Sequence, residues 1–220
     1  MKRSLFRRYA GFCVASVLMA LGIALITNSN LGTTPITSLP FALGAIFSLS
    51  LGTVTFLLNA VFVLLQKLLL WKEFSARHLI QLPAVLLFSV CIDLCMWLTR
   101  PLVTSTYVLQ VLQCLIGCAV LGLGISLEIV CNATVQPGEG IVIAIAYRAR
   151  KVFSSIKVMF DVSMVLLAAL LSFLVLHKVV GLREGTVVAA LLTGLWVSFF
   201  SRWTSRLAPF FHEQKLSITE

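Results

Sequence analysis

The stretch that decides the fold closes an apolar segment with a polar break, and from Gly22 to Pro35 it reads Gly-Ile-Ala-Leu-Ile-Thr-Asn-Ser-Asn-Leu-Gly-Thr-Thr-Pro. It returns without a gap 102 residues later (22 to 124), where the chain from Gly124 to Pro137 reads Gly-Ile-Ser-Leu-Glu-Ile-Val-Cys-Asn-Ala-Thr-Val-Gln-Pro. The shared asparagine and proline carry the most weight, because both are unusual inside apolar stretches. We interpret the pattern as an internal duplication of two half-chains, each broken at an Asn…Pro element.

The composition places the chain in a lipid bilayer. Of its 220 residues 60% are hydrophobic and only 11% are charged, which is too apolar for a soluble domain. Several apolar runs reach the roughly 20 residues that a helix needs to cross a bilayer. The runs are continuous rather than alternating, which argues against a transmembrane β-barrel. We therefore expect an all-α polytopic protein with a single membrane domain over residues 1–220.

The net charge of +9 does not indicate a nucleic-acid partner, because the basic residues lie at the chain ends and between apolar runs. We interpret the first apolar run as an uncleaved helix with a cytoplasmic N-terminus. The six cysteines lie in or beside apolar runs, where thiols usually pack as small apolar groups. The pairs Cys91/Cys95 and Cys114/Cys118 share helix faces, but no histidine joins them. We expect neither a metal site nor a cofactor.

The topology depends on two short segments, 35–49 and 137–150, which are brief for a full crossing. If both are broken or re-entrant, repeat one (about 9–98) and repeat two (about 107–200) each have three full transmembrane helices and are inverted. Fourteen of the 17 Lys and Arg then lie in the cytoplasm, and three (Arg100, Lys178 and Arg183) lie outside. If all eight segments cross, only twelve lie inside, so the positive-inside rule favours the first arrangement. Both put the two termini, including the tail 201–220, in the cytoplasm.

A family resemblance appears in the same stretches. The run from Asn28 to Pro40, Asn-Ser-Asn-Leu-Gly-Thr-Thr-Pro-Ile-Thr-Ser-Leu-Pro, and the run from Ser50 to Asn59, Ser-Leu-Gly-Thr-Val-Thr-Phe-Leu-Leu-Asn, resemble the YitT/YczE-type bacterial membrane proteins. Segments 137–140, 157–161 and 180–186 fit the same group. The resemblance covers nearly the whole chain and implies a multi-pass protein of the bacterial inner (plasma) membrane. We expect no soluble C-terminal domain of the kind that some YitT-like proteins carry, and the resemblance implies no substrate or mechanism.

Ionisable side chains inside apolar segments are costly and indicate either function or pairing. Four acidic residues qualify as ion or proton sites: Asp93, Glu128, Glu139 and Asp161. Asp93 lies near a segment end, and Lys157 stands four residues before Asp161, so helix packing is an alternative role for both. Glu139 follows the proline of the second break, where it is able to bind a cation, take up a proton or cap the short helix.

Polar side chains around both breaks suggest a substrate site between the repeats. The candidates are Asn30, Thr33, Thr34, Asn132, Gln136 and Glu139. The alternative is that they only satisfy backbone groups where the helices are interrupted.

No catalytic motif is recognisable, so we do not expect an enzyme. The leading hypothesis is a small secondary transporter or permease for a small molecule or ion, with its site at the repeat interface. The runner-up is a membrane sensor, scaffold or assembly factor that acts through a protein partner. Homo-oligomers are compatible with either hypothesis.

Overall fold

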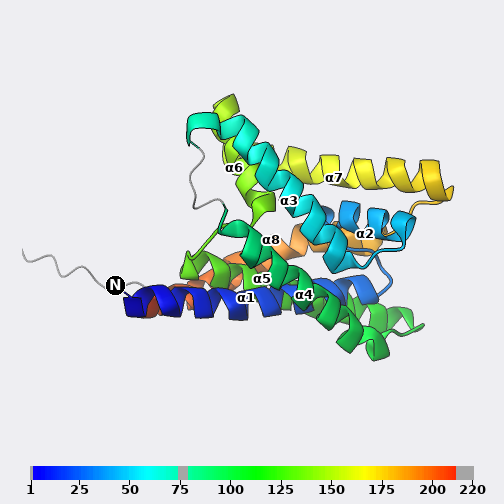
Figure 1. Ribbon diagram of the computed structural model, residues 1–220. Coiled ribbons are helices and arrows are strands. Elements are labelled where there is room, and N and C mark those ends of the chain that lie inside the picture. Colours follow the sequence, from blue (N-terminus) through cyan, green and yellow to red (C-terminus); the bar gives the residue numbers. More distant parts are fainter. Residues whose placement is uncertain (1, 74–78, 212–220) are drawn as a thin grey trace, which may run out of the picture.

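The computed structural model describes residues 2–73 and 79–211, and these residues contain helices and no strand (Figure 1). The α-helices are α1 (Lys2–Asn28), α2 (Pro35–Phe47), α3 (Leu51–Leu70), α4 (Gln81–Thr99), α5 (Tyr107–Cys131), α6 (Pro137–Ala149), α7 (Phe153–Leu176), α8 (Glu184–Thr204) and α9 (Ala208–Phe211). Short 3₁₀ turns follow α3, α4 and α8, namely η1 (Trp71–Glu73), η3 (Arg100–Leu102) and η4 (Ser205–Leu207).

Six of the described helices, α1, α3, α4, α5, α7 and α8, are long and apolar enough to cross a membrane. The other two main helices, α2 and α6, have 13 residues each. At 1.5 Å per residue each is about 20 Å long, against about 30 Å of hydrocarbon. The predicted all-α polytopic class, with a short second and sixth segment, is confirmed, and the chain is a multi-pass membrane protein.

The two short helices begin and end in the same way. Each starts at a proline, whose fixed φ suits a first helical turn. Each is preceded by a left-handed asparagine and ends at a left-handed residue. The matching positions are Asn30 and Asn132 (φ 61° and 44°), Pro35 and Pro137, and Ser48 and Arg150 (φ 55° and 52°), and every pair is 102 residues apart. These local backbone features therefore recur at the offset found in the sequence.

The centre of the molecule is an antiparallel pair, α1 and α5, that meets at glycines. A Cβ on Gly22 of α1 would lie 2.6 Å from the backbone nitrogen of Leu121, and a Cβ on Gly124 of α5 would lie 2.8 Å from that of Met19. These two contacts are equivalent, because Met19 and Leu121 are also 102 residues apart. Small residues at a crossing let two helix backbones approach closely.

The remaining helices complete two groups of four. In the first group α4 packs on α1 and α8 packs on α5. In the second group α2 packs on α7, and α6 packs on α3. Each group has its own main cluster of buried apolar side chains, and the groups are joined where α3 packs on α4 and Leu51 of α3 enters the first cluster. Figure 1 shows α3, α6 and α7 above α1, α4 and α5. Exchanging the two halves of the chain maps the two pairings given for each group onto each other, which supports a two-repeat arrangement as an interpretation.

Candidate functional site

The first helix break is held in place by hydrogen bonds to the loop before α8 and to the first turn of α8. The Thr33 N–H donates to the Gly181 carbonyl at 3.0 Å, and the Gly185 N–H donates to the Leu31 carbonyl at 2.7 Å. The Arg183 side chain donates to the backbone carbonyl of Asn30 at 2.9 Å. Three buried hydroxyls, those of Thr33, Thr34 and Thr37, hydrogen-bond to one another. Most polar groups of this break are therefore used to hold the backbone, although the buried Thr27 hydroxyl near the end of α1 has no hydrogen bond.

The second break keeps polar groups without partners. Glu128, near the end of α5, is only 7% exposed, and its Oε1 has no hydrogen bond. The Nε2 of Gln136, just before α6, is also buried and unpaired. Glu139, in the first turn of α6, forms no hydrogen bond or ion pair with any residue that the structure describes. Buried polar groups normally have partners, so this cluster indicates a place for a ligand, a proton or water.

One wall of the second break is an amide from α3. Gln66 is 1% exposed, and its Nε2 donates to the Pro137 carbonyl at 3.2 Å and to the Gln81 side chain at 3.3 Å. Its Oε1 has no partner. A Cβ on Gly140 would lie only 2.8 Å from that oxygen, so the amide packs directly against the glycine.

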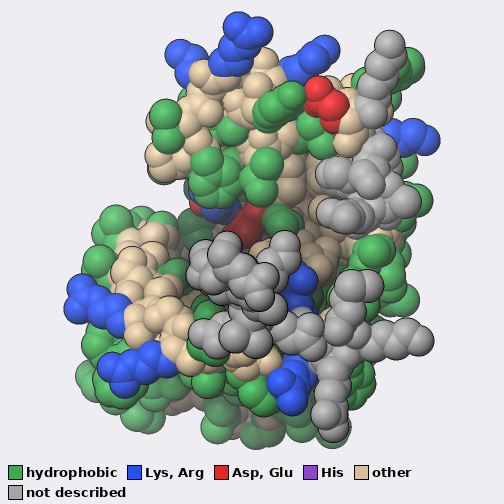
Figure 2. All heavy atoms as spheres, turned by 90° about the vertical axis from the view of Figure 1, so that its left-hand side faces the viewer, with side chains coloured by type: hydrophobic (Ala, Val, Ile, Leu, Met, Phe, Trp, Pro, Cys, Tyr) green, Lys and Arg blue, Asp and Glu red, His purple; other side chains and the backbone are tan. Residues whose placement is uncertain are grey.

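The charges around the second break are predominantly negative. The Glu128 and Glu139 carboxyls lie close enough to repel each other, and Glu139 also interacts with Lys157 and Asp161. Lys157 and Asp161 pair at 2.8 Å along α7, each with 27% of its side chain exposed. Three carboxyls thus lie near two cations, the Lys157 ammonium and the Arg8 guanidinium, which donates to the Cys131 carbonyl at 3.0 Å at the end of α5, and near the weak positive end of the α6 dipole. Figure 2 shows acidic and basic side-chain atoms recessed in a hollow near the middle of one face.

The first turns of the two short helices meet at the pseudo-equivalent residues Ile36 and Gly138. A Cβ on Gly138 would lie 2.8 Å from the Cδ1 of Ile36. This contact places four of the predicted site residues, Thr33, Thr34, Gln136 and Glu139, in or beside two adjoining helix starts. The two asparagines are not part of this arrangement, because Asn30 and Asn132 are exposed and follow the far ends of the antiparallel α1 and α5.

Asp93 has a separate position. Its carboxylate accepts hydrogen bonds from the Ser50 hydroxyl at 2.6 Å and from the Gly52 N–H at 2.7 Å. It therefore caps the start of α3 and ties α4 to it. The position 102 residues later is Leu195, which is 66% exposed, and α7 makes no comparable contact with α8.

Sequence reasoning did not select Gln66 or Gln81. The available signal was an isolated amide within the apolar run Leu51–Leu70, since polar side chains at membrane depth need a partner. A search restricted to ionisable residues does not find this amide.

Comparison with known proteins places the chain in a family. A family model described as a family of unknown function (DUF6198) matches residues 6–202. An uncharacterised protein of Haemophilus influenzae is 28% identical over 192 residues, which cover 86% of this chain and 81% of the relative. No solved structure matches. Because residues 6–202 are most of the chain, the protein belongs to this family of unknown function, DUF6198.

Proposed function

We propose that the protein is a small secondary transporter or permease that binds a proton or another small cation at the second helix break. The observation that carries the proposal is the contrast between the two breaks. The first break uses its hydroxyl and backbone groups for internal hydrogen bonds, with the Thr27 hydroxyl as an exception, and it has no acidic side chain. The second has unpaired Glu128 and Gln136 atoms beside a Glu139 that forms no hydrogen bond or ion pair within residues 2–73 and 79–211.

The charge balance supports a cationic ligand. Three carboxyls lie near two cations, Lys157 and Arg8, which leaves an excess of one negative charge. A carboxylate away from water is costly unless it is protonated, paired or matched to a cation. The partial positive charge at the start of α6 offsets only part of this. A proton or a small cation would neutralise the excess, whereas an anionic substrate would increase it.

The proposed inverted repeat supplies a route for such a ligand. Helices α1 and α5 are equivalent in sequence and antiparallel in space, which is what inversion in the membrane plane produces. The two short helices start against each other, as half-helices do at midplane sites of transporters. In this proposal the termini are cytoplasmic, the membrane is the bacterial inner membrane, and the YitT/YczE-type resemblance reflects common descent.

A sensor or scaffold is the second candidate, favoured by the first break alone. There most polar side chains form hydrogen bonds within the protein, as expected of a protein that moves nothing across the membrane. Its binding surface would then lie at the cytoplasmic face, and the second break would be a structural irregularity.

Charge movement in proteoliposomes tests the transporter proposal. Purified protein on a solid-supported membrane receives sudden jumps of protons, Na⁺, K⁺ or small alkylamines, and transient currents are recorded. We expect a current in the wild type that disappears in Glu139→Gln and persists in Glu184→Gln. Glu184 is a matched control because it is half-exposed beside Arg183, away from the second break. Equal currents in wild type and Glu139→Gln, or no wild-type current with any of these cations, would contradict the proposal.

A further inference from the structure

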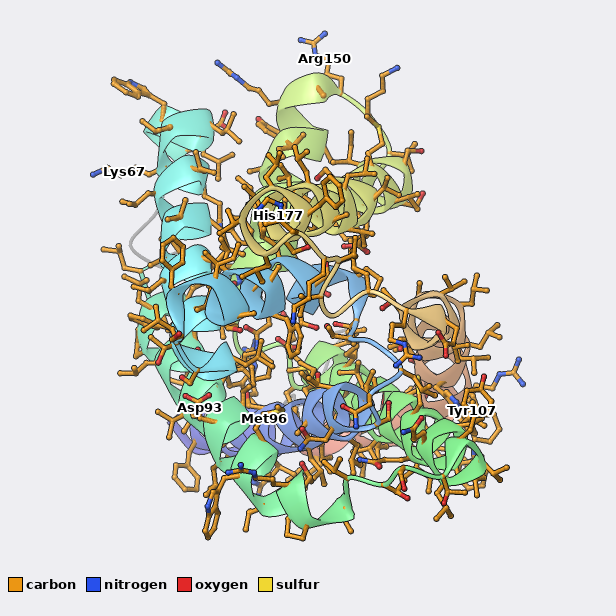
Figure 3. All side chains as sticks on the ribbon, turned by 90° about the vertical axis from the view of Figure 1, so that its right-hand side faces the viewer. Lys67, Asp93, Met96, Tyr107, Arg150 and His177 are labelled. Atoms are coloured by element: carbon orange, nitrogen blue, oxygen red, sulfur yellow. The ribbon has the colours of Figure 1, made fainter. Side chains whose placement is uncertain are left out.

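A second polar feature lies at the other end of α6, away from Glu139. A groove of about 920 Å³ runs along the last turns of α6 and the start of α7, beside η1. Its polar wall is the run Arg148, Arg150 and Lys151, and its apolar wall includes Ile143 and Phe153. Figure 3 shows Arg150 at the tip of the helix, pointing away from the molecule.

The three basic side chains of this groove are unpaired. None forms a hydrogen bond through its side chain or an ion pair with another described residue, and all three are exposed. The acidic group on the wall, Glu73, already accepts a hydrogen bond from the Tyr147 hydroxyl at 3.1 Å. The negative end of the α6 dipole explains why one basic residue lies in the last turn of this helix. It does not explain a cluster of three. Figure 2 shows Lys and Arg side chains gathered along the upper edge of the face.

The apolar side of the groove narrows the choice of ligand. Ile143 is 47% exposed and Phe153 is 43% exposed, and both lie on short or membrane-spanning helices rather than in a loop. A soluble anion would use only the basic wall. A phospholipid would use both, because its phosphate meets the cations while its acyl chains lie along the apolar residues.

We propose that this groove binds the headgroup of an anionic phospholipid. The lipid phosphate contacts Arg148, Arg150 and Lys151, and the acyl chains follow Ile143 and Phe153. A lipid held there fixes the C-terminal end of α6, the short helix whose first turn carries Glu139. The binding itself does not depend on whether the protein transports anything.

Lipid titration of the full-length protein in a neutral detergent tests the proposal. Thermal unfolding and native mass spectrometry are followed while phosphatidylglycerol or phosphatidylcholine with the same acyl chains is added. We expect phosphatidylglycerol to stay bound and to raise the melting temperature more than phosphatidylcholine. Each removed basic side chain should weaken binding about five-fold, from about 1 kcal/mol per charge near an anionic lipid.

Two variants make the test specific. Arg148→Gln/Arg150→Gln/Lys151→Gln should lose the preference for phosphatidylglycerol. Arg202→Gln/Arg206→Gln, which changes basic residues in the last turn of α8 and in η4, should keep it. Arg150→Gly guards against misfolding, because glycine tolerates the left-handed conformation at this position (φ 52°) and removes the charge.

Three results would overturn the proposal. The first is an unchanged lipid preference in the triple variant, and the second is an equal loss in the α8 variant. The third is full competition by water-soluble glycerol phosphate, which would assign the groove to free phosphate compounds instead.

Discussion

Replacing Gly22 by alanine should destabilise the protein, because the new methyl group has no room. The added Cβ would lie 2.6 Å from the backbone nitrogen and 2.7 Å from the Cα of Leu121. Ordinary contacts with a Cβ begin at 3.4 Å, so α1 and α5 must separate by close to 1 Å along the central crossing. Backbone atoms cannot swing aside as a side chain can.

Overpacking of this kind costs about 1–3 kcal/mol, and the better helix propensity of alanine returns about 0.5–1 kcal/mol. We therefore expect a net loss of about 1–2 kcal/mol for Gly22→Ala and a similar loss for Gly124→Ala, which meets the backbone of Met19. Gly194→Ala is the matched control, since a Cβ there has nothing within 4 Å and should be neutral or slightly stabilising. Steric trapping in lipid bicelles measures these free energies of unfolding. Equal stability of Gly22→Ala and Gly194→Ala would refute the close α1–α5 crossing.

Three further predictions concern side chains. Asp93→Ala should cost about 1–3 kcal/mol in the same assay, because the Ser50 hydroxyl and the Gly52 N–H lose their acceptor; an unchanged stability would show that the cap is dispensable. Glu139→Gln should melt at or above the wild-type temperature, because no described residue pairs with the carboxylate; a large drop would reveal a structural ion pair. Glu73→Gln should lower the pKa of Tyr147, because the hydrogen bond to the Glu73 carboxylate stabilises the neutral phenol and raises that pKa. Ultraviolet titration of tyrosinate measures it, with Tyr147→Phe identifying the signal, and an unchanged titration would exclude the hydrogen bond.

The sequence was sufficient for the membrane class and for the two short helices. Apolar run lengths predicted the six long helices, and Pro35 and Pro137 marked the starts of α2 and α6. These features are local, because they depend on hydropathy and on the fixed φ of proline.

The sequence did not predict the tertiary contacts. The role of Asp93 depends on Ser50 and Gly52, which are some 40 residues earlier and pack beside it only once α3 and α4 are assembled. Asn30 and Asn132 look like one site because they match in sequence. Since α1 and α5 are antiparallel, the equivalence instead puts them at opposite ends.

Water access to the second break is the measurement that separates transport from scaffolding most directly. Glu139→Cys and Thr34→Cys are placed in a chain in which the exposed Cys13 and the half-buried Cys91 are replaced by serine, since the other four cysteines are buried. A charged, membrane-impermeant thiol reagent is then applied to either side of membrane vesicles. If the second break binds a cation from water, Glu139→Cys reacts from at least one side and the buried Thr34→Cys at the first break stays unmodified. Protection of Glu139→Cys from both sides, in folded protein, would contradict a transport site there.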